Sequence, residues 1–127
     1  MRPLPNRYTI LLVDDADDTL RPPARLLQFS GYDVRLAHNA AEALAVAAEG
    51  GRLDLIISDL GLPDGNGMDL MRDVKARFGL RGIAVTGYDG DQTVDACRSA
   101  GFERHFAKPI HFEDLRVALS ELLPSMQ

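Results

Sequence analysis

The stretch YTILLVDDADD, residues 8–18, joins an apolar run directly to four aspartates in five positions. Residues 8–13 are rich in Ile, Leu and Val, which is typical of a strand buried on both faces. Asp14, Asp15, Asp17 and Asp18 are all negative at neutral pH, and two unit charges ~4 Å apart cost roughly 1 kcal/mol in water and several times more near a protein surface. Such crowding behind a buried strand indicates that a positively charged group or ion lies among these aspartates.

The same strand signal recurs along the chain in alternation with helical patterns. We predict strands over residues 8–13, 33–37, 54–58, 82–86 and 105–108. Strand, helix and strand repeated in this way predict an α/β fold with right-handed crossovers and a doubly wound, five-stranded parallel sheet covered on both faces. With 127 residues and a mass of 13.9 kDa, the chain suits one domain, residues 1–127, with its core at about 7–123.

Helix signals fill the intervals between the predicted strands. Asn39 followed by Glu42 is typical of an N-cap with a back-bonding acid ahead of an Ala-rich helix. Apolar stripes predict two further helices with buried faces, formed by Met68, Met71, Val74 and Phe78 and by Phe112, Leu115, Leu119 and Leu122. Residues 91–100 carry the weakest helical pattern, with Val94 and Cys97 as the clear inward candidates.

The first helix conflicts with its own sequence. It should begin near Asp17, yet Pro22 and Pro23 fall inside it, and a proline in a helix interior removes a donor and clashes with the preceding turn at a cost of ~3 kcal/mol. Because proline suits only the first helical turn, we predict that the regular helix begins at about Pro22.

Charge and composition exclude several classes of function. The net charge of -5 disfavours direct nucleic-acid binding, and no apolar run reaches the ~18–20 residues that membrane insertion requires. The single cysteine, Cys97, permits no internal disulfide and is expected to be a small core residue. These features suit a cytoplasmic protein.

Polar residues follow four of the predicted strands at the point where each ends. Asp14 and Asp15 follow the first, Asp59 follows the third, Thr86 closes the fourth and Lys108 closes the fifth. Each alone suits an ordinary role as a turn, cap or solvated residue. Because ligands of doubly wound sheets bind beyond the carboxyl ends of the strands, their coincidence at one edge predicts a shared site.

The residue types at this edge point to phosphoryl chemistry. Three carboxylates brought together must take up protons or hold a cation, and oxygen ligands without His or Cys favour Mg²⁺ before Ca²⁺. Lys108 would supply a second positive charge for a phosphoryl group and Thr86 a hydroxyl, which leaves Asp59 as the nucleophile that forms an acyl phosphate. Asp17 and Asp18 would instead favour the positive end of the first helix.

Four motifs together resemble the receiver domain of two-component response regulators. LLVDDADD (11–18), IISDLGLPDGNG (56–67), IAVTG (83–87) and HFAKP (105–109) occur in the family's order and spacing, and the likeness spans residues 7–123. The resemblance implies the flavodoxin-like (βα)5 fold with strand order 2-1-3-4-5.

The resemblance also implies roles for the site residues. Asp59 would accept a phosphoryl group from a phosphohistidine of a histidine kinase or a histidine phosphotransfer protein. Asp15, Asp59 and the backbone carbonyl of Gly61 would ligate Mg²⁺, with Asp14 acting through water, and Lys108 would pair with the phosphoryl group or with Asp59. Pro63 and Gly67 match the turn and helix start behind the phosphorylated aspartate.

Three further positions relate to switching and to phosphoryl lifetime. In the family an aromatic residue follows the Thr86 hydroxyl inward on phosphorylation, and His105 stands where Tyr or Phe is commoner. An imidazole titrates near pH 6.5 when unperturbed, so His105 is either a switch residue with pH sensitivity or a half-exposed strand residue. Gly61 and Tyr88 occupy the positions that tune phosphoryl lifetime.

The leading hypothesis is a phosphoacceptor switch that catalyses its own phosphorylation and dephosphorylation without being an enzyme toward another substrate. Its output would pass through the fourth helix (91–100), the fifth strand and the fifth helix (112–122) to a downstream protein or an attached domain.

The alternative is a pseudo-receiver that serves as a constitutive interaction module. A flavodoxin-type FMN binder and an aspartate-based phosphatase fit less well, because the first would want a hydroxyl-rich loop after the first strand and the second an acid at Gly61. We expect a monomer before phosphorylation, and the motifs look most like receivers of hybrid sensor kinases.

Overall fold

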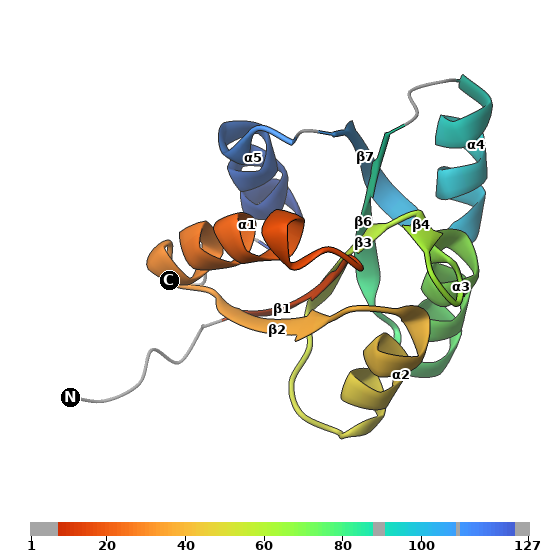
Figure 1. Cartoon of the computed structure of the whole chain (residues 1–127), viewed down its shortest axis with the longest axis horizontal. Coiled ribbons are helices and arrows are strands. Elements are labelled where there is room, and N and C mark those ends of the chain that lie inside the picture. Colours follow the sequence, from red (N-terminus) through yellow and green to blue (C-terminus); the bar gives the residue numbers. More distant parts are fainter. Residues whose placement is uncertain (1–7, 88–90, 109, 124–127) are drawn as a thin grey trace.

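The computed structural model describes residues 8–87, 91–108 and 110–123, and at residues 17, 19, 20 and 91–93 it describes the backbone only (Figure 1). A five-stranded parallel sheet lies at the centre of the molecule. Its strands are β1 (Thr9–Val13), β2 (Asp33–Ala37), β3 (Leu55–Asp59), β6 (Arg81–Thr86) and β7 (Phe102–Ala107). They lie in the order β2-β1-β3-β6-β7, which is 2-1-3-4-5 when the strands of this sheet are counted along the chain. The predicted fold and strand order are therefore confirmed.

Helices cover both faces of the sheet (Figure 1). On one face lie α1 (Asp17–Phe29) and α5 (Phe112–Leu122), and on the other lie α2 (Ala40–Ala48), α3 (Gly67–Phe78) and α4 (Asp91–Ala100). The pleat of β1 shows why both faces are apolar. Ile10 and Leu12 enter the core beneath α1 and α5, whereas Leu11 and Val13 enter the core beneath α2, α3 and α4. Burial on both faces explains the continuous apolar run.

The first helix begins earlier than its prolines predict. α1 runs from Asp17 through Pro22 and Pro23 to Phe29, so the predicted start near Pro22 is wrong. Proline fixes φ close to the helical value, and the missing N–H groups affect only the carbonyls four residues earlier, in the first turn. The burial of Ala24 (6% exposed) and Leu27 (0%) against the sheet outweighs that local cost, because tertiary packing overrides helix propensity.

The other helices follow their sequence signals, except that Phe78, predicted on the buried face of α3, is 38% exposed. The Asn39 side chain accepts a hydrogen bond from the backbone N–H of Glu42 at 2.8 Å, and the Glu42 carboxylate reaches back to the N–H of His38 at 3.1 Å. Cys97 on α4 is 1% exposed, and burial raises the pKa of its thiol, as expected for a core residue. Within the described part of the chain, no helix is both long and apolar enough to cross a membrane.

The sequence patterns did not predict the early start of β7 or the short hairpin before α3. β7 begins at Phe102 rather than at residue 105, because an edge strand tolerates charged residues such as Glu103, which pairs with Arg81 through two hydrogen bonds of 2.7 and 3.1 Å. Between β3 and α3, the chain forms a short antiparallel hairpin of β4 (Gly61–Leu62) and β5 (Gly65–Asn66). We call residues 60–67 the β3–α3 loop.

Candidate functional site

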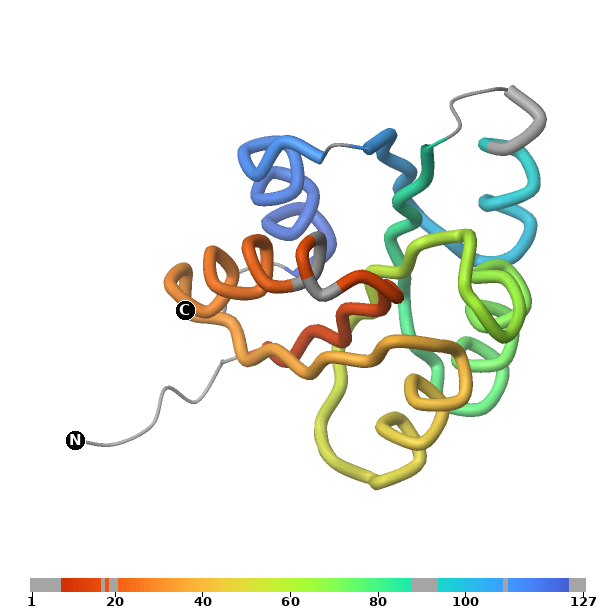
Figure 2. The backbone as a smooth tube through the Cα atoms, in the orientation of Figure 1, coloured from red at the N-terminus to blue at the C-terminus, as the bar shows by residue number. Residues whose placement is uncertain are grey.

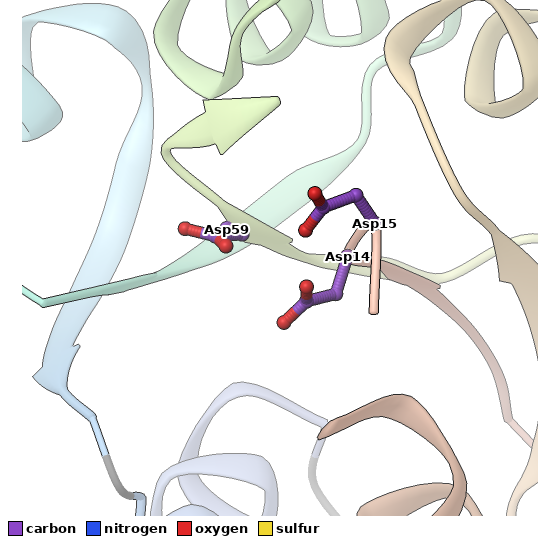
Figure 3. A group of neighbouring side chains, drawn as sticks. All are labelled: Asp14, Asp15 and Asp59. Carbon is purple, nitrogen blue, oxygen red and sulfur yellow. The ribbon is translucent and has the colours of Figure 1, made fainter. Parts of the chain in front are cut away.

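The ends of β1 and β3 bring three carboxylates together. Asp14 and Asp15 follow β1, and Asp59 is the last residue of β3, which lies next to β1 in the sheet. Each of the three offers a carboxylate oxygen, and these oxygens all lie within 4.8 Å of one another (Figure 3). Asp59 lies more than forty positions after Asp14 and Asp15 in the sequence. The parallel pairing of β1 with β3 nevertheless brings the three residues into one acidic cluster.

Lys108 joins the cluster from the end of β7. Its Nζ lies 2.7 Å from Oδ2 of Asp59 and 3.1 Å from Oδ2 of Asp14. The backbone positions it, because the N–H of Lys108 donates to the carbonyl of Thr86 at 2.8 Å and so continues the β6–β7 pairing. Burial alone lowers the pKa of Lys108, but its hydrogen bonds to Asp59 and Asp14 outweigh that effect and raise the pKa above its usual value.

The carboxylates at the centre of the cluster are largely enclosed and held by backbone donors. The side chains of Asp14 and Asp59 are 11% and 13% exposed. Oδ1 of Asp14 accepts the N–H of Ala16 at 3.2 Å, and Oδ1 of Asp59 accepts the N–H of Gly61 at 3.1 Å. Asp15 is exposed. Among the described side chains of the cluster, one ammonium faces three carboxylates, so negative charge is in excess in a partly desolvated space, where charge is costly.

The donor set of this cluster fits a hard divalent cation. Carboxylate oxygens from two strand ends offer the ligands that Mg²⁺ and Ca²⁺ take, and the described cluster contains no sulfur or imidazole ligand. A dication would offset the charge that Lys108 leaves uncompensated. Asp17 and Asp18 are the first two residues of α1, whose N-cap, Ala16, supplies no capping side chain.

Thr86 and His105 lie on neighbouring strands near the cluster. Thr86 ends β6 and is 3% exposed, and His105 pairs with Ala84 across β6 and β7. His105 is partly buried, and its Nε2 is the one buried side-chain nitrogen or oxygen that lacks a hydrogen-bond partner among the residues the structure describes. A buried polar atom without a hydrogen-bond partner costs free energy, so the described conformation of the His105 side chain is energetically unfavourable.

Of the two positions expected to tune phosphoryl lifetime, Gly61 and Tyr88, the structure describes only Gly61. Gly61 is exposed, and nothing lies within 4 Å of the place where a side chain would begin, so this flank of Asp59 is open. Tyr88 lies outside the described residues.

An apolar cavity of about 650 Å³ between α1 and α5 adjoins the cluster, which the sequence patterns did not indicate. Asp14, Asp59 and Lys108 line one part of it, and its apolar walls include Leu26 and Phe112. Because these walls come from helices far apart in sequence, no local pattern could have revealed the cavity.

Comparison with known proteins decides the family. Residues 10–120 match the family model of the response regulator receiver domain. The chain belongs to this family. The receiver domain from Methanospirillum hungatei JF-1 has a similar structure, with a TM-score of 0.84 and 34% identity over 92% of this chain and 94% of that one.

Curated relatives of this receiver domain are longer proteins. The sensor kinase CckA of Brucella abortus (strain 2308) is 33% identical over 91% of this chain and 12% of its own length. The acid tolerance regulatory protein ActR of Rhizobium meliloti (strain 1021) is 33% identical over 87% of this chain and 57% of its own length. This receiver domain thus spans a small part of the first relative and little more than half of the second.

One solved relative bears directly on the acidic cluster. A response regulator protein from Burkholderia pseudomallei has a TM-score of 0.81 and 31% identity over 88% of this chain and 66% of that one. Its crystal structure is described as containing a phosphorylated aspartic acid, a calcium ion and citrate.

Proposed function

We propose that this receiver domain accepts a phosphoryl group on Asp59 from a phosphohistidine of a partner protein. The observation that carries the proposal is the hydrogen bond of 2.7 Å between Lys108 and Asp59 beside two further carboxylates. Phosphoryl transfer needs a positioned nucleophile and positive charge around the transferred oxygens, and little else from the protein. The partner would be a histidine kinase or a histidine phosphotransfer protein.

The proposed transfer uses groups that are already in place. A carboxylate oxygen of Asp59 attacks phosphorus and the P–N bond of the phosphohistidine breaks. The electron pair of that bond stays on the departing nitrogen, and because the other ring nitrogen is protonated, a neutral imidazole leaves. Lys108, released from its carboxylate partners, pairs with a phosphoryl oxygen and stabilises the charge that it carries. The Thr86 hydroxyl donates to another phosphoryl oxygen. Hydrolysis of the acyl phosphate by water returns Asp59 to its carboxylate form.

Asp15, Asp59 and the carbonyl of Gly61 would hold Mg²⁺ directly, and Asp14 would act through water. Bound there, the ion would supply electrostatic stabilisation of the phosphoryl oxygens. The hydrogen bond from the Gly61 N–H to Oδ1 of Asp59 supports this assignment, since it holds the backbone at Gly61 close to the nucleophile.

Output would follow from the new charge at the end of β3. Phosphorylation would change the charge at Asp59 from -1 to about -2, and drawing Lys108 and Thr86 toward the phosphoryl group would bias the surface formed by α4, β7 and α5 between two arrangements. His105 supports this view, since its buried nitrogen without a hydrogen-bond partner favours a change in the position of the side chain.

We further propose that residues 7–123 fold as one domain and that the unphosphorylated chain is a monomer. A downstream protein or an attached domain would bind the surface formed by α4, β7 and α5.

Intact-mass spectrometry tests the proposal. Incubation with Mg²⁺ and acetyl phosphate should add the mass of one phosphoryl group to the wild-type chain, and EDTA should prevent the addition. The Asp59→Asn variant keeps the size of the side chain and removes the nucleophile, so it should gain no mass under the same conditions. An unmodified wild-type chain would favour the pseudo-receiver alternative, and an Asp59→Asn variant that is modified equally would contradict Asp59 as the acceptor.

A further inference from the structure

The β3–α3 loop is poorly suited to hold its own shape. Gly61, Gly65 and Gly67 occupy three of its eight positions, and glycine loses more conformational freedom on folding than any other residue. The hairpin within the loop consists of only two residue pairs, and a hairpin of two strands is marginally stable on its own. The loop therefore depends on contacts with the rest of the molecule.

One end of the loop is fixed by packing against the sheet. The N–H of Gly67 donates to the carbonyl of Leu60 at 2.8 Å, and Leu62 is buried, with 8% of its surface exposed. These contacts hold the base of the hairpin, but they leave the turn at residues 63–65 without support from the core.

The carboxylate of Asp64 holds that turn to the start of α2. Its Oδ1 accepts the N–H of Ala40 at 2.8 Å, and its Oδ2 accepts the N–H of Ala41 at 3.0 Å. These are the first two residues of α2, more than twenty positions earlier in the sequence, and Figure 2 shows the loop passing beside this helix start. The two hydrogen bonds lower the pKa of Asp64, and its carboxylate lies at the positive end of the helix.

α2 does not need Asp64 for its own N-cap. Asn39 already caps the helix by accepting the N–H of Glu42, and Asp64 satisfies the two remaining N–H groups of the first turn. The distinctive consequence of the Asp64 contacts is thus the link between α2 and the loop.

We propose that Asp64 is a positioning residue, which clamps the β3–α3 loop to α2 and so holds Gly61 beside Asp59. The proposal rests on the proposed function, in which the Gly61 carbonyl is a Mg²⁺ ligand. Gly61 and Asp64 lie on the same short hairpin, and the Gly61 N–H is bonded to Oδ1 of Asp59. Releasing the turn would let the Gly61 peptide move relative to Asp59 and weaken metal binding, while the residues of the transfer step stay intact.

The Asp64→Ala variant tests the clamp through metal affinity. Mg²⁺ titration followed by the NMR shift of the Gly61 amide should give a dissociation constant about three- to tenfold higher than in the wild type. Phosphorylation by acetyl phosphate should need a correspondingly higher Mg²⁺ concentration for half-maximal rate, and its rate at saturating Mg²⁺ should be close to that of the wild type. Asp64→Asn, which keeps one acceptor oxygen, should fall between the two.

Hydrogen exchange in metal-free protein provides a readout that is independent of metal and phosphate. The amides of residues 61–66 and of Ala40 and Ala41 should exchange faster in Asp64→Ala than in the wild type. Asn39→Ala is the matched control, because it removes a cap from the same helix end without touching the loop. This control should leave the Mg²⁺ affinity and the exchange of residues 61–66 unchanged.

Two results would overturn the clamp. One is an Asp64→Ala variant with wild-type Mg²⁺ affinity and wild-type exchange over residues 61–66. The other is an Asn39→Ala variant that weakens Mg²⁺ binding as much as Asp64→Ala, which would assign the effect to helix stability. A wild-type chain that takes no phosphoryl group would instead contradict the proposed function, and the exchange experiment would still test the link between Asp64 and the loop.

Discussion

Replacing Lys108 with methionine should slow phosphorylation of Asp59 by acetyl phosphate about 10²-fold, because loss of one preorganised charge or donor at a transferring group typically costs 10²–10³ in rate. The same variant should bind Mg²⁺ more tightly, by roughly fivefold, since a unit positive charge removed at ~4 Å changes the interaction by ~1 kcal/mol even in water. Lys108 bonds both Asp14 and Asp59, so in the metal-free protein it competes for the oxygens that would hold the ion. Tighter Mg²⁺ binding together with slower phosphoryl transfer would show that Lys108 both competes with the ion for the carboxylates and assists the transfer.

Lys75 provides the control for that experiment. It is the only other lysine of the chain, and it is an exposed residue of α3. Lys75→Met makes the same chemical change and should alter neither the Mg²⁺ affinity nor the rate of phosphorylation, as measured by NMR titration and by intact-mass time courses. If Lys108→Met and Lys75→Met behaved alike, Lys108 would have no special role at Asp59.

Replacing Gly67 with alanine should destabilise the domain by about 1–3 kcal/mol, the usual cost of forcing an extra group into a packed site. A Cβ at this position would clash with the carbonyl oxygen of Asp59 and would lie 3.0 Å from Cα of Leu60. Both are backbone atoms, so the chain around Asp59 itself must shift to make room. Urea denaturation should report the lower stability, and phosphorylation should fall because the displaced residue is the proposed nucleophile.

Gly65 in the same loop is the matched control for Gly67. Nothing lies within 4 Å of a Cβ built on it, and its φ is not positive, so Gly65→Ala should change the free energy of unfolding by no more than about 0.5 kcal/mol. Equal stability of Gly67→Ala and Gly65→Ala would show that the approach of α3 to β3 is not as close as described.

The fold could be predicted because its strongest signals are local. Continuous apolar runs mark strands buried on both faces, and both faces of β1 are indeed filled by residues of the YTILLV segment. The start of α1 could not be predicted, since the cost of Pro22 and Pro23 is local whereas the compensating burial of Leu27 depends on the completed sheet. The early start of β7 was missed for a related reason, because Glu103 is charged and its partner, Arg81, lies on another strand.

The site was predictable to the extent that strand ends share one edge. That rule placed Asp14, Asp15, Asp59 and Lys108 together. In the structure the three carboxylates lie within 4.8 Å of one another, and Lys108 is hydrogen-bonded to Asp14 and Asp59. The rule is silent about loops. No role was assigned to Asp64 from the sequence, because its hydrogen bonds to the start of α2 depend on a packing arrangement that no sequence pattern encodes.

The most direct measurement locates the phosphoryl group itself. After incubation with Mg²⁺ and acetyl phosphate, borohydride reduces an aspartyl phosphate to homoserine, which peptide mass spectrometry assigns to a position. We expect homoserine at position 59 in the presence of Mg²⁺, and none there when EDTA is present or when acetyl phosphate is left out. Homoserine at position 14 or 15 in place of 59, or none anywhere in the chain, would contradict the account.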